Sequence, residues 1–183
     1  NAVGMAIAER ALAARFNTDE HTVVDHWTWV IAGDGCLMEG ITSEASSLAG
    51  HLGLGKLIVF YDSNRISIEG STELAFTEDV KRRYEAYGWQ VLEGSAYEVE
   101  ALRRMIDEAK SDQSRSTLVV LESVIGYGSP NKANTAASHG APLGATEVAA
   151  TRAALASSRR RRAAPRARAS FHSPEHEGPS AMA

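Results

Sequence analysis

The sequence of 183 residues predicts an α/β fold, in which helices flank a mostly parallel sheet. Four short apolar runs alternate along the chain with stretches of helical periodicity. Alternation of this kind builds right-handed βαβ units, whose strands run parallel. With 44% hydrophobic and 23% charged residues, the chain has the composition of one globular domain with a buried core.

The apolar runs predict four buried strands. They cover residues 28–32, 57–61, 89–92 and 118–121. The first strand ends at Gly33-Asp34-Gly35 and the second at Asp62-Ser63-Asn64, and both segments are typical of tight turns. Ligands of such sheets bind at the carboxyl ends of the strands, so Asp34 and Asn64 lie where a ligand is expected.

Helical periodicity predicts the segments that cover this sheet. They span residues 1–16, 39–52, 80–87, 97–110 and 147–155. The first is rich in alanine, and its residues Val3, Ile7 and Leu12 fall on or near one face, as in an amphipathic helix. It has no N-cap signal before it, so the chain is expected to begin inside an element and to be a fragment.

The composition changes after the fourth strand. Residues 126–144 form a long loop rich in glycine, serine and asparagine that contains His139, and loops of this length are functional or disordered. Residues 156–183 are of low complexity, with four consecutive arginines and no apolar periodicity, and we expect this tail to be disordered. His172 and His176 lie in the tail without cysteines or a fold around them, so no zinc site is expected there.

Charge and composition narrow the possible partners. The net charge is −4, yet residues 152–183 hold seven arginines and two glutamates, so the domain before them is acidic. An acidic domain repels nucleic acid, and the arginines of the tail alternate with alanine and proline rather than with aromatic residues that stack on bases. We therefore expect no nucleic-acid partner.

The chain also lacks the sequence signals of membrane and secreted proteins. No stretch approaches the roughly 18–20 apolar residues of a membrane helix, and the N-terminal residues do not resemble a signal peptide. The single cysteine, Cys36, excludes an intrachain disulfide and is expected to be a small packed residue. These features predict a cytoplasmic protein without a membrane partner.

The two strand ends carry a set of groups suited to a metal–diphosphate complex. The glycines of Gly33-Asp34-Gly35 allow close approach of a diphosphate. Asp34 offers a carboxylate oxygen, Asn64 an amide oxygen and Ile66 a backbone carbonyl, and magnesium prefers such oxygen ligands together with phosphate oxygens. Each turn alone is weak evidence for a site, because Asp34 and Asn64 are also common turn residues.

The segments around these residues resemble the thiamine-diphosphate-binding domain of transketolases. The similar segments are 33–41 (GDGCLMEGI), 43–52 (SEASSLAGHL), 66–70 (ISIEG), 125–129 (IGYGS) and 138–144 (SHGAPLG). The resemblance extends from Asn1 to about Leu155, so residues 1–155 are expected to be part of a diphosphate-binding domain, followed by the tail of residues 156–183.

The resemblance implies roles for individual residues. Asp34, Asn64 and the Ile66 carbonyl would bind Mg²⁺, for which Ca²⁺ or Mn²⁺ could substitute. The segment Gly33–Gly35 and Asn64 would hold the diphosphate of thiamine diphosphate, and Ile68 would pack near the cofactor.

Three further residues receive catalytic roles from the resemblance. His139 would contact the diphosphate and the sugar substrate, and a solvated loop histidine is the less favoured alternative. Glu39 and Glu44 resemble carboxylates at the dimer interface that link two active sites. Their place near the start of a helix is also explained by the helix dipole.

Transketolases transfer a two-carbon ketol unit from a ketose phosphate, such as xylulose 5-phosphate or sedoheptulose 7-phosphate. The acceptor is an aldose phosphate, such as ribose 5-phosphate or glyceraldehyde 3-phosphate. The resemblance therefore implies an enzyme of the pentose phosphate pathway or Calvin cycle, active as a homodimer.

Parts of the family pattern are missing, namely an upstream cofactor segment and the pyrimidine-binding domain, so the isolated chain is expected to be inactive. Beyond Leu155 the pattern stops abruptly, as it would after a reading-frame shift. A dihydroxyacetone synthase, a deoxyxylulose-phosphate synthase and a non-catalytic module with the same fold remain alternatives.

Overall fold

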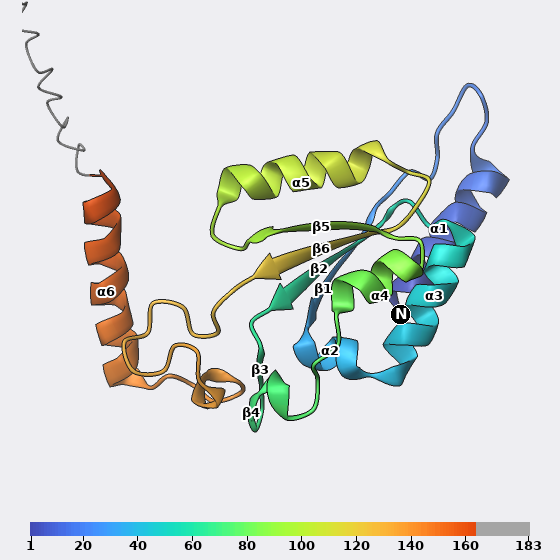
Figure 1. The fold of residues 1–183 in the computed structure, drawn as a ribbon. Helices are drawn as coiled ribbons and strands as arrows, with labels where there is room; N and C mark the ends of the chain where they lie inside the picture. Colours follow the sequence, from blue (N-terminus) through green and yellow to red (C-terminus); the bar gives the residue numbers. More distant parts are fainter. Residues whose placement is uncertain (164–183) are drawn as a thin grey trace, which may run out of the picture.

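A computed structural model of the protein describes residues 1–163, and the side chains of residues 1–157. At its centre lies a parallel sheet of four strands in the order β1-β2-β6-β5 (Figure 1). The strands are β1 (Thr28–Gly33), β2 (Leu57–Ser63), β5 (Gln90–Ser95) and β6 (Thr117–Glu122). The predicted α/β fold with a mostly parallel sheet is therefore confirmed.

Helices cover both faces of this sheet (Figure 1). One face packs against α1 (Ala2–Phe16), α3 (Gly40–Leu52) and α4 (Val80–Ala86), and the other packs against α5 (Val99–Ser111). Successive strand residues point to opposite faces, so Val59 and Tyr61 lie in the first core and Ile58 in the second. The first core is the larger and extends to the carboxyl end of β2.

The helix predicted over residues 1–16 is present as α1, but its buried positions do not coincide with its large apolar residues. Ile7 and Leu12 are exposed, whereas Ala6 and Glu9 are buried. Glu9 tolerates burial because its carboxylate lies 2.7 Å from the Lys56 ammonium, and paired charges are the ones that proteins bury. The apolar pattern does not mark the packed face here because a charged residue occupies it.

The segment after β1 also differs from the prediction. The turn at Gly33-Asp34-Gly35 is followed at once by a short helix, α2 (Asp34–Met38), and only then by α3. Leu37, which is almost fully buried, fixes α2 against the core. The single helix predicted over residues 39–52 is thus preceded by a separate turn of helix that begins at Asp34.

Between β2 and α4 the predicted polar loop contains small regular elements. The strands β3 (Ile66–Ser67) and β4 (Gly70–Ser71) form an antiparallel hairpin, and the 3-10 helix η1 (Thr72–Leu74) follows. Asp79 caps the N-terminus of α4, with its side chain accepting a hydrogen bond from the Arg82 N–H. This segment closes one side of the carboxyl edge of the sheet.

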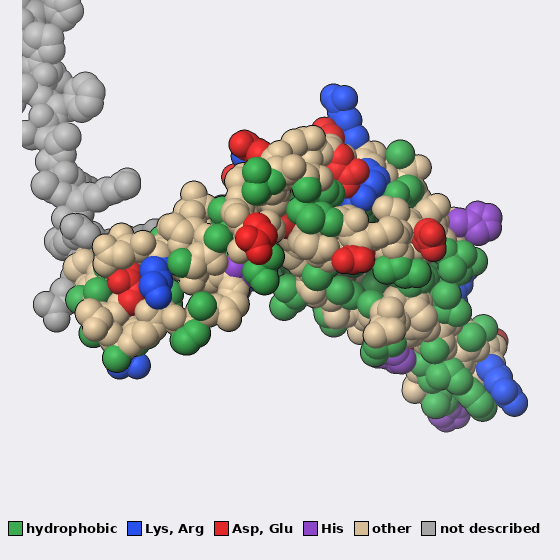
Figure 2. Space-filling model, turned by 90° about the horizontal axis from the view of Figure 1, so that it is seen from below, with side chains coloured by type: hydrophobic (Ala, Val, Ile, Leu, Met, Phe, Trp, Pro, Cys, Tyr) green, Lys and Arg blue, Asp and Glu red, His purple; other side chains and the backbone are tan. Residues whose placement is uncertain are grey.

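The C-terminal part contains the loop after β6, the 3-10 helix η2 (Ala136–Ser138) and α6 (Ala145–Ala163). Together they form a lobe that stands apart from the sheet and its helices (Figure 2). The last helix is longer than the predicted span of residues 147–155, so the tail predicted to be disordered over residues 156–183 begins within a helix. Its remainder, residues 164–183, lies outside the described residues. Within residues 1–163, no helix combines the length and the apolar character that crossing a membrane requires.

Candidate functional site

Asp34 occupies the position where the first strand meets a helix. β1 ends at Gly33 in extended conformation, and Asp34 is the first residue of α2. The Asp34 side chain is only 3% exposed. A Cβ placed on Gly33 or Gly35 would meet open space, so neither the backbone conformation nor local packing requires glycine there. The free space beside both glycines is what a closely approaching diphosphate needs.

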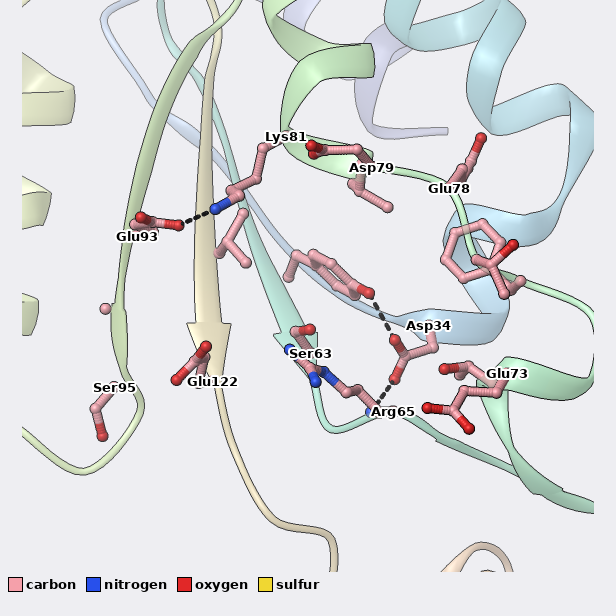
Figure 3. Close-up of a pocket in the computed structure, with 17 residues that line it drawn as sticks. Asp34, Ser63, Arg65, Glu73, Glu78, Asp79, Lys81, Glu93, Ser95 and Glu122 are labelled. Carbon is pink, nitrogen blue, oxygen red and sulfur yellow. Dashed lines mark hydrogen bonds and ion pairs between the residues drawn. The ribbon is translucent and has the colours of Figure 1, made fainter.

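Two donors hold the Asp34 carboxylate (Figure 3). The Tyr61 hydroxyl donates to Oδ1 at 2.5 Å, and the Arg65 backbone N–H donates to Oδ2 at 3.0 Å. Burial, and then the hydrogen bond to Asp34, raise the pKa of Tyr61 well above its ordinary value, so the hydroxyl keeps its proton and acts as a donor. Each carboxylate oxygen accepts one hydrogen bond and keeps a lone pair for a further partner.

The turn after β2, which carries Asn64 and Ile66, contacts Asp34 through the backbone N–H of Arg65. The Asn64 side-chain oxygen accepts a hydrogen bond from the Ile66 N–H at 3.0 Å, the pattern of an Asx turn. Arg65, between them, has a positive φ of 61°, and its N–H reaches Asp34. The turn is therefore bent so that its backbone contacts the carboxylate at the neighbouring strand end.

These groups fit a magnesium–diphosphate complex. Asp34, Asn64 and the Ile66 carbonyl would offer one anionic and two neutral oxygens, the hard donors that Mg²⁺ selects. Within residues 1–163, no group of three or more His, Cys, Asp or Glu side chains could hold a metal. A cation at this mixed set would need further oxygens from a ligand, which a diphosphate supplies.

An open cavity of about 680 Å³ adjoins Asp34 at the carboxyl edge of the sheet. Asp34, Tyr61 and Arg65 line it near β2, and Lys81 and Glu93 line its far side, where they form an ion pair at 2.6 Å (Figure 3). Ligands of parallel sheets bind at this edge. The sequence prediction identified Asp34 but missed the contact of Tyr61 with it, because Tyr61 ends the apolar run of β2 and that run indicates only a buried strand.

The other predicted residues lie apart from this cavity. Glu39 precedes α3 and Glu44 lies within it, and both are exposed. Ile68 is 71% exposed in the turn between β3 and β4. His139 is exposed in the lobe, directly after η2. The structure thus brings together the Asp34 and Asn64–Ile66 segments, and it does not bring His139, Glu39 or Glu44 to them.

A buried carboxylate organises the loop that carries His139. Glu147, at the start of α6, accepts hydrogen bonds from the Asn131 side chain at 3.0 Å, from the Asn131 N–H at 2.9 Å and from the Ser129 hydroxyl. The bonds from Asn131, followed by that from Ser129, lower the pKa of Glu147 to about 2. Its ionised form therefore anchors one side of the loop to α6.

Comparison with known proteins identifies the family. The family model described as "Transketolase, thiamine diphosphate binding domain" matches residues 1–175. The chain belongs to the transketolase family. A transketolase from Nostoc sp. is 57% identical over 155 residues, which are 83% of this chain and 23% of that protein.

Solved transketolases share the fold. The enzyme from Leishmania mexicana is 50% identical with a TM-score of 0.82, over 85% of this chain and 23% of that chain. Two transketolase structures from Pichia stipitis contain xylulose 5-phosphate and sedoheptulose 7-phosphate, respectively. Each is 49% identical to this chain with a TM-score of 0.80, and the match covers 83% of this chain and 23% of theirs. The chain thus spans about a quarter of the length of the transketolases it matches.

Proposed function

We propose that this chain supplies the magnesium–diphosphate anchor of a transketolase. Asp34, Asn64 and the Ile66 carbonyl hold Mg²⁺, or Ca²⁺ or Mn²⁺ in its place, and Gly33 and Gly35 leave room for the diphosphate. The observation that carries the proposal is the contact between the Asp34 carboxylate and the turn of residues 64–66, at a cavity on the carboxyl edge of the sheet. Ile68, exposed on the adjacent hairpin, would contact the cofactor from outside the sheet.

The protein that contains this domain is proposed to transfer two-carbon ketol units between sugar phosphates. The donors would be xylulose 5-phosphate and sedoheptulose 7-phosphate, the sugars in the related Pichia stipitis structures, and the acceptors ribose 5-phosphate and glyceraldehyde 3-phosphate. Bound thiamine diphosphate supplies the electron sink for the carbanion. This chain's residues orient and neutralise the diphosphate, and His139 would bind it and the substrate from the lobe. Such an enzyme belongs to the pentose phosphate pathway or Calvin cycle, and the lone cysteine suits the cytoplasm.

The surface of α3 supports a homodimer of the parent enzyme. Glu39 and Glu44 are exposed there, next to Ile41 and Leu48, which are 69% and 46% exposed. Large apolar side chains beside carboxylates are typical of a surface that another subunit covers. In that setting Glu39 and Glu44 would be buried and could link two active sites.

The isolated chain is proposed to bind cofactor without catalysing ketol transfer. Its candidate site is an open cavity, and the chain corresponds to 23% of its relatives' length, so most groups that would position a substrate lie elsewhere. Positioning is a major part of rate enhancement. Formation of erythrose 4-phosphate by the pure chain would contradict this part of the proposal.

Isothermal titration calorimetry tests the anchor. Thiamine diphosphate is titrated into the chain with and without Mg²⁺, and binding is expected only with the metal. Asp34→Asn should abolish the metal-dependent heat, because it removes the only carboxylate among the three proposed ligands. Glu93→Gln is the matched control, since Glu93 lines the same cavity but pairs with Lys81. Equal loss in both variants would contradict a specific role for Asp34.

A further inference from the structure

The Asp34 carboxylate depends on a tyrosine from the neighbouring strand. Parallel pairing places Ala32 opposite Tyr61 and Gly33 opposite Asp62, so the Tyr61 side chain lies beside the start of α2. Its hydroxyl donates to Asp34 Oδ1 at 2.5 Å, the shorter of the two hydrogen bonds that the carboxylate accepts. The contact thus follows from the register of the sheet.

The two donors to Asp34 differ in how firmly they are held. Tyr61 is 4% exposed and belongs to the larger core, where it packs in the same cluster as Ala32, Val59 and Val120. Arg65 is exposed, lies in a bent turn and contributes only its backbone N–H. Tyr61 is therefore the rigid support, since its ring cannot turn without disturbing the core.

We propose that Tyr61 is a positioning residue for the metal site. It holds Oδ1 of Asp34 so that the remaining lone pairs of the carboxylate point to the cation beside the turn of residues 64–66. This inference rests on the proposed function, because it presupposes a cation at Asp34. Hydrogen-bond partners of metal ligands orient those ligands, and their loss typically lowers metal affinity by about 10–100-fold.

Tyr61 could instead be an ordinary core tyrosine whose hydroxyl needs a partner, and the chain contains a control for this alternative. Tyr84, on α4, is 1% exposed, and its hydroxyl is hydrogen-bonded to Ser46 Oγ at 3.1 Å. It lies in the same core but does not line the cavity beside Asp34. Phenylalanine at either position removes one buried hydroxyl and keeps the ring.

The test compares Mg²⁺ affinity in Tyr61→Phe and Tyr84→Phe, by calorimetry in the presence of the same excess of thiamine diphosphate. Urea unfolding of each metal-free variant accompanies it. Tyr61→Phe is expected to bind Mg²⁺ at least about tenfold more weakly, whereas Tyr84→Phe should bind like the wild type even if its unfolding midpoint falls. Unchanged Mg²⁺ affinity in Tyr61→Phe, or equal weakening in both variants, would overturn the proposal.

A measurement on the wild-type chain avoids any dependence on variant folding. Proton NMR of the Tyr61 hydroxyl should show a low-field, slowly exchanging signal that persists when Mg²⁺ and thiamine diphosphate are added. Loss of that signal on addition would mean that Tyr61 releases Asp34 and does not position it. If the wild-type chain binds no Mg²⁺ at all, the proposed anchor fails and this inference fails with it, whereas a failure confined to Tyr61→Phe leaves the anchor intact.

Discussion

Arg83→Met is expected to destabilise the protein by separating α2 from α3 and α4. Arg83 Nη2 donates to the Leu37 carbonyl at 3.0 Å, and Nη1 donates to the Ser43 hydroxyl at 3.1 Å and lies 2.7 Å from a Glu78 carboxylate oxygen. The Arg83 side chain is 16% exposed. Because α2 begins at Asp34, the bond to Leu37 also supports the candidate site.

The magnitude follows mainly from these three polar contacts. A hydrogen bond from a charged donor, such as that to Leu37, contributes about 1.5–3 kcal/mol, and the neutral Ser43 partner about 1 kcal/mol. Glu78 is 41% exposed, so its ion pair adds less than about 1 kcal/mol. Among the described residues, Arg83 Nε is buried without a partner, and methionine removes that unfavourable group. The net loss is therefore expected to be about 2–3 kcal/mol.

Urea unfolding followed by tryptophan fluorescence measures this loss. The signal is sensitive to the region, because Trp89 is buried and its indole N–H donates to the Ser46 carbonyl. Glu78→Gln is the control and should cost under about 1 kcal/mol. The reasoning would be refuted if Arg83→Met changed the free energy of unfolding by no more than about 0.5 kcal/mol, the range of ordinary surface substitutions. An equal loss of stability in Glu78→Gln would also refute it.

Three further predictions concern other parts of the fold. The pKa of Glu147 is about 2, below its ordinary 4.5, so its ionised form stabilises the folded state above pH 4.5 and that contribution is lost as pH falls toward 2. Glu147→Gln should therefore remove this pH dependence of the free energy of unfolding, measured between pH 4.5 and 2. Lys56→Met leaves the buried Glu9 carboxylate without its cation and should cost about 3 kcal/mol in urea unfolding. A Cβ on Gly50 would stand 1.9 Å from a backbone oxygen, so Gly50→Ala should cost about 1–3 kcal/mol or more by the same measurement.

Matched controls separate these effects from general damage. Asp25 also pairs with Lys56 but is 62% exposed, so Asp25→Asn should lower the free energy of unfolding far less than Lys56→Met does. Gly4 lies in α1, and a methyl group there would have open space around it, so Gly4→Ala should stabilise by roughly 0.8–1 kcal/mol. Each contact would be contradicted by one result. For Glu147 it is a Glu147→Gln variant whose stability keeps the pH dependence of the wild type. For Lys56 it is a loss of stability in Lys56→Met no larger than in Asp25→Asn, and for Gly50 it is an unchanged stability of Gly50→Ala.

The four strands and the positions of α3, α4 and α5 could be predicted from apolar runs and helical periodicity, whereas only part of α6 was predicted. The helix α2 could not, because its residues Asp34 and Gly35 favour turns. It forms because Leu37 is buried and Arg83 binds the Leu37 carbonyl, and both contacts are tertiary. The hairpin of β3 and β4 was missed because two-residue strands leave no pattern to detect.

The meeting of the two strand ends at the candidate site was predictable, whereas the contacts that support Asp34 were not. Asp34 and Asn64 follow apolar strands, and parallel pairing brings such strand ends together. The role of Tyr61 depends on the register between β1 and β2, which no local pattern specifies. Glu9 shows the same limit, since its burial in α1 depends on Lys56, far along the chain.

A thermal-shift titration tests the anchor at Asp34 most directly. The chain is heated alone, with Mg²⁺, with thiamine diphosphate and with both. At ligand concentrations about 100 times Kd, binding to the folded state adds about 2.7 kcal/mol, which for a protein of this size raises Tm by roughly 5–11 °C. We predict this rise only with both components present, and none in Asp34→Ala. No rise in a folded wild-type chain, or an equal rise in Asp34→Ala, would contradict the assignment of the metal–diphosphate site to Asp34 and the turn of residues 64–66.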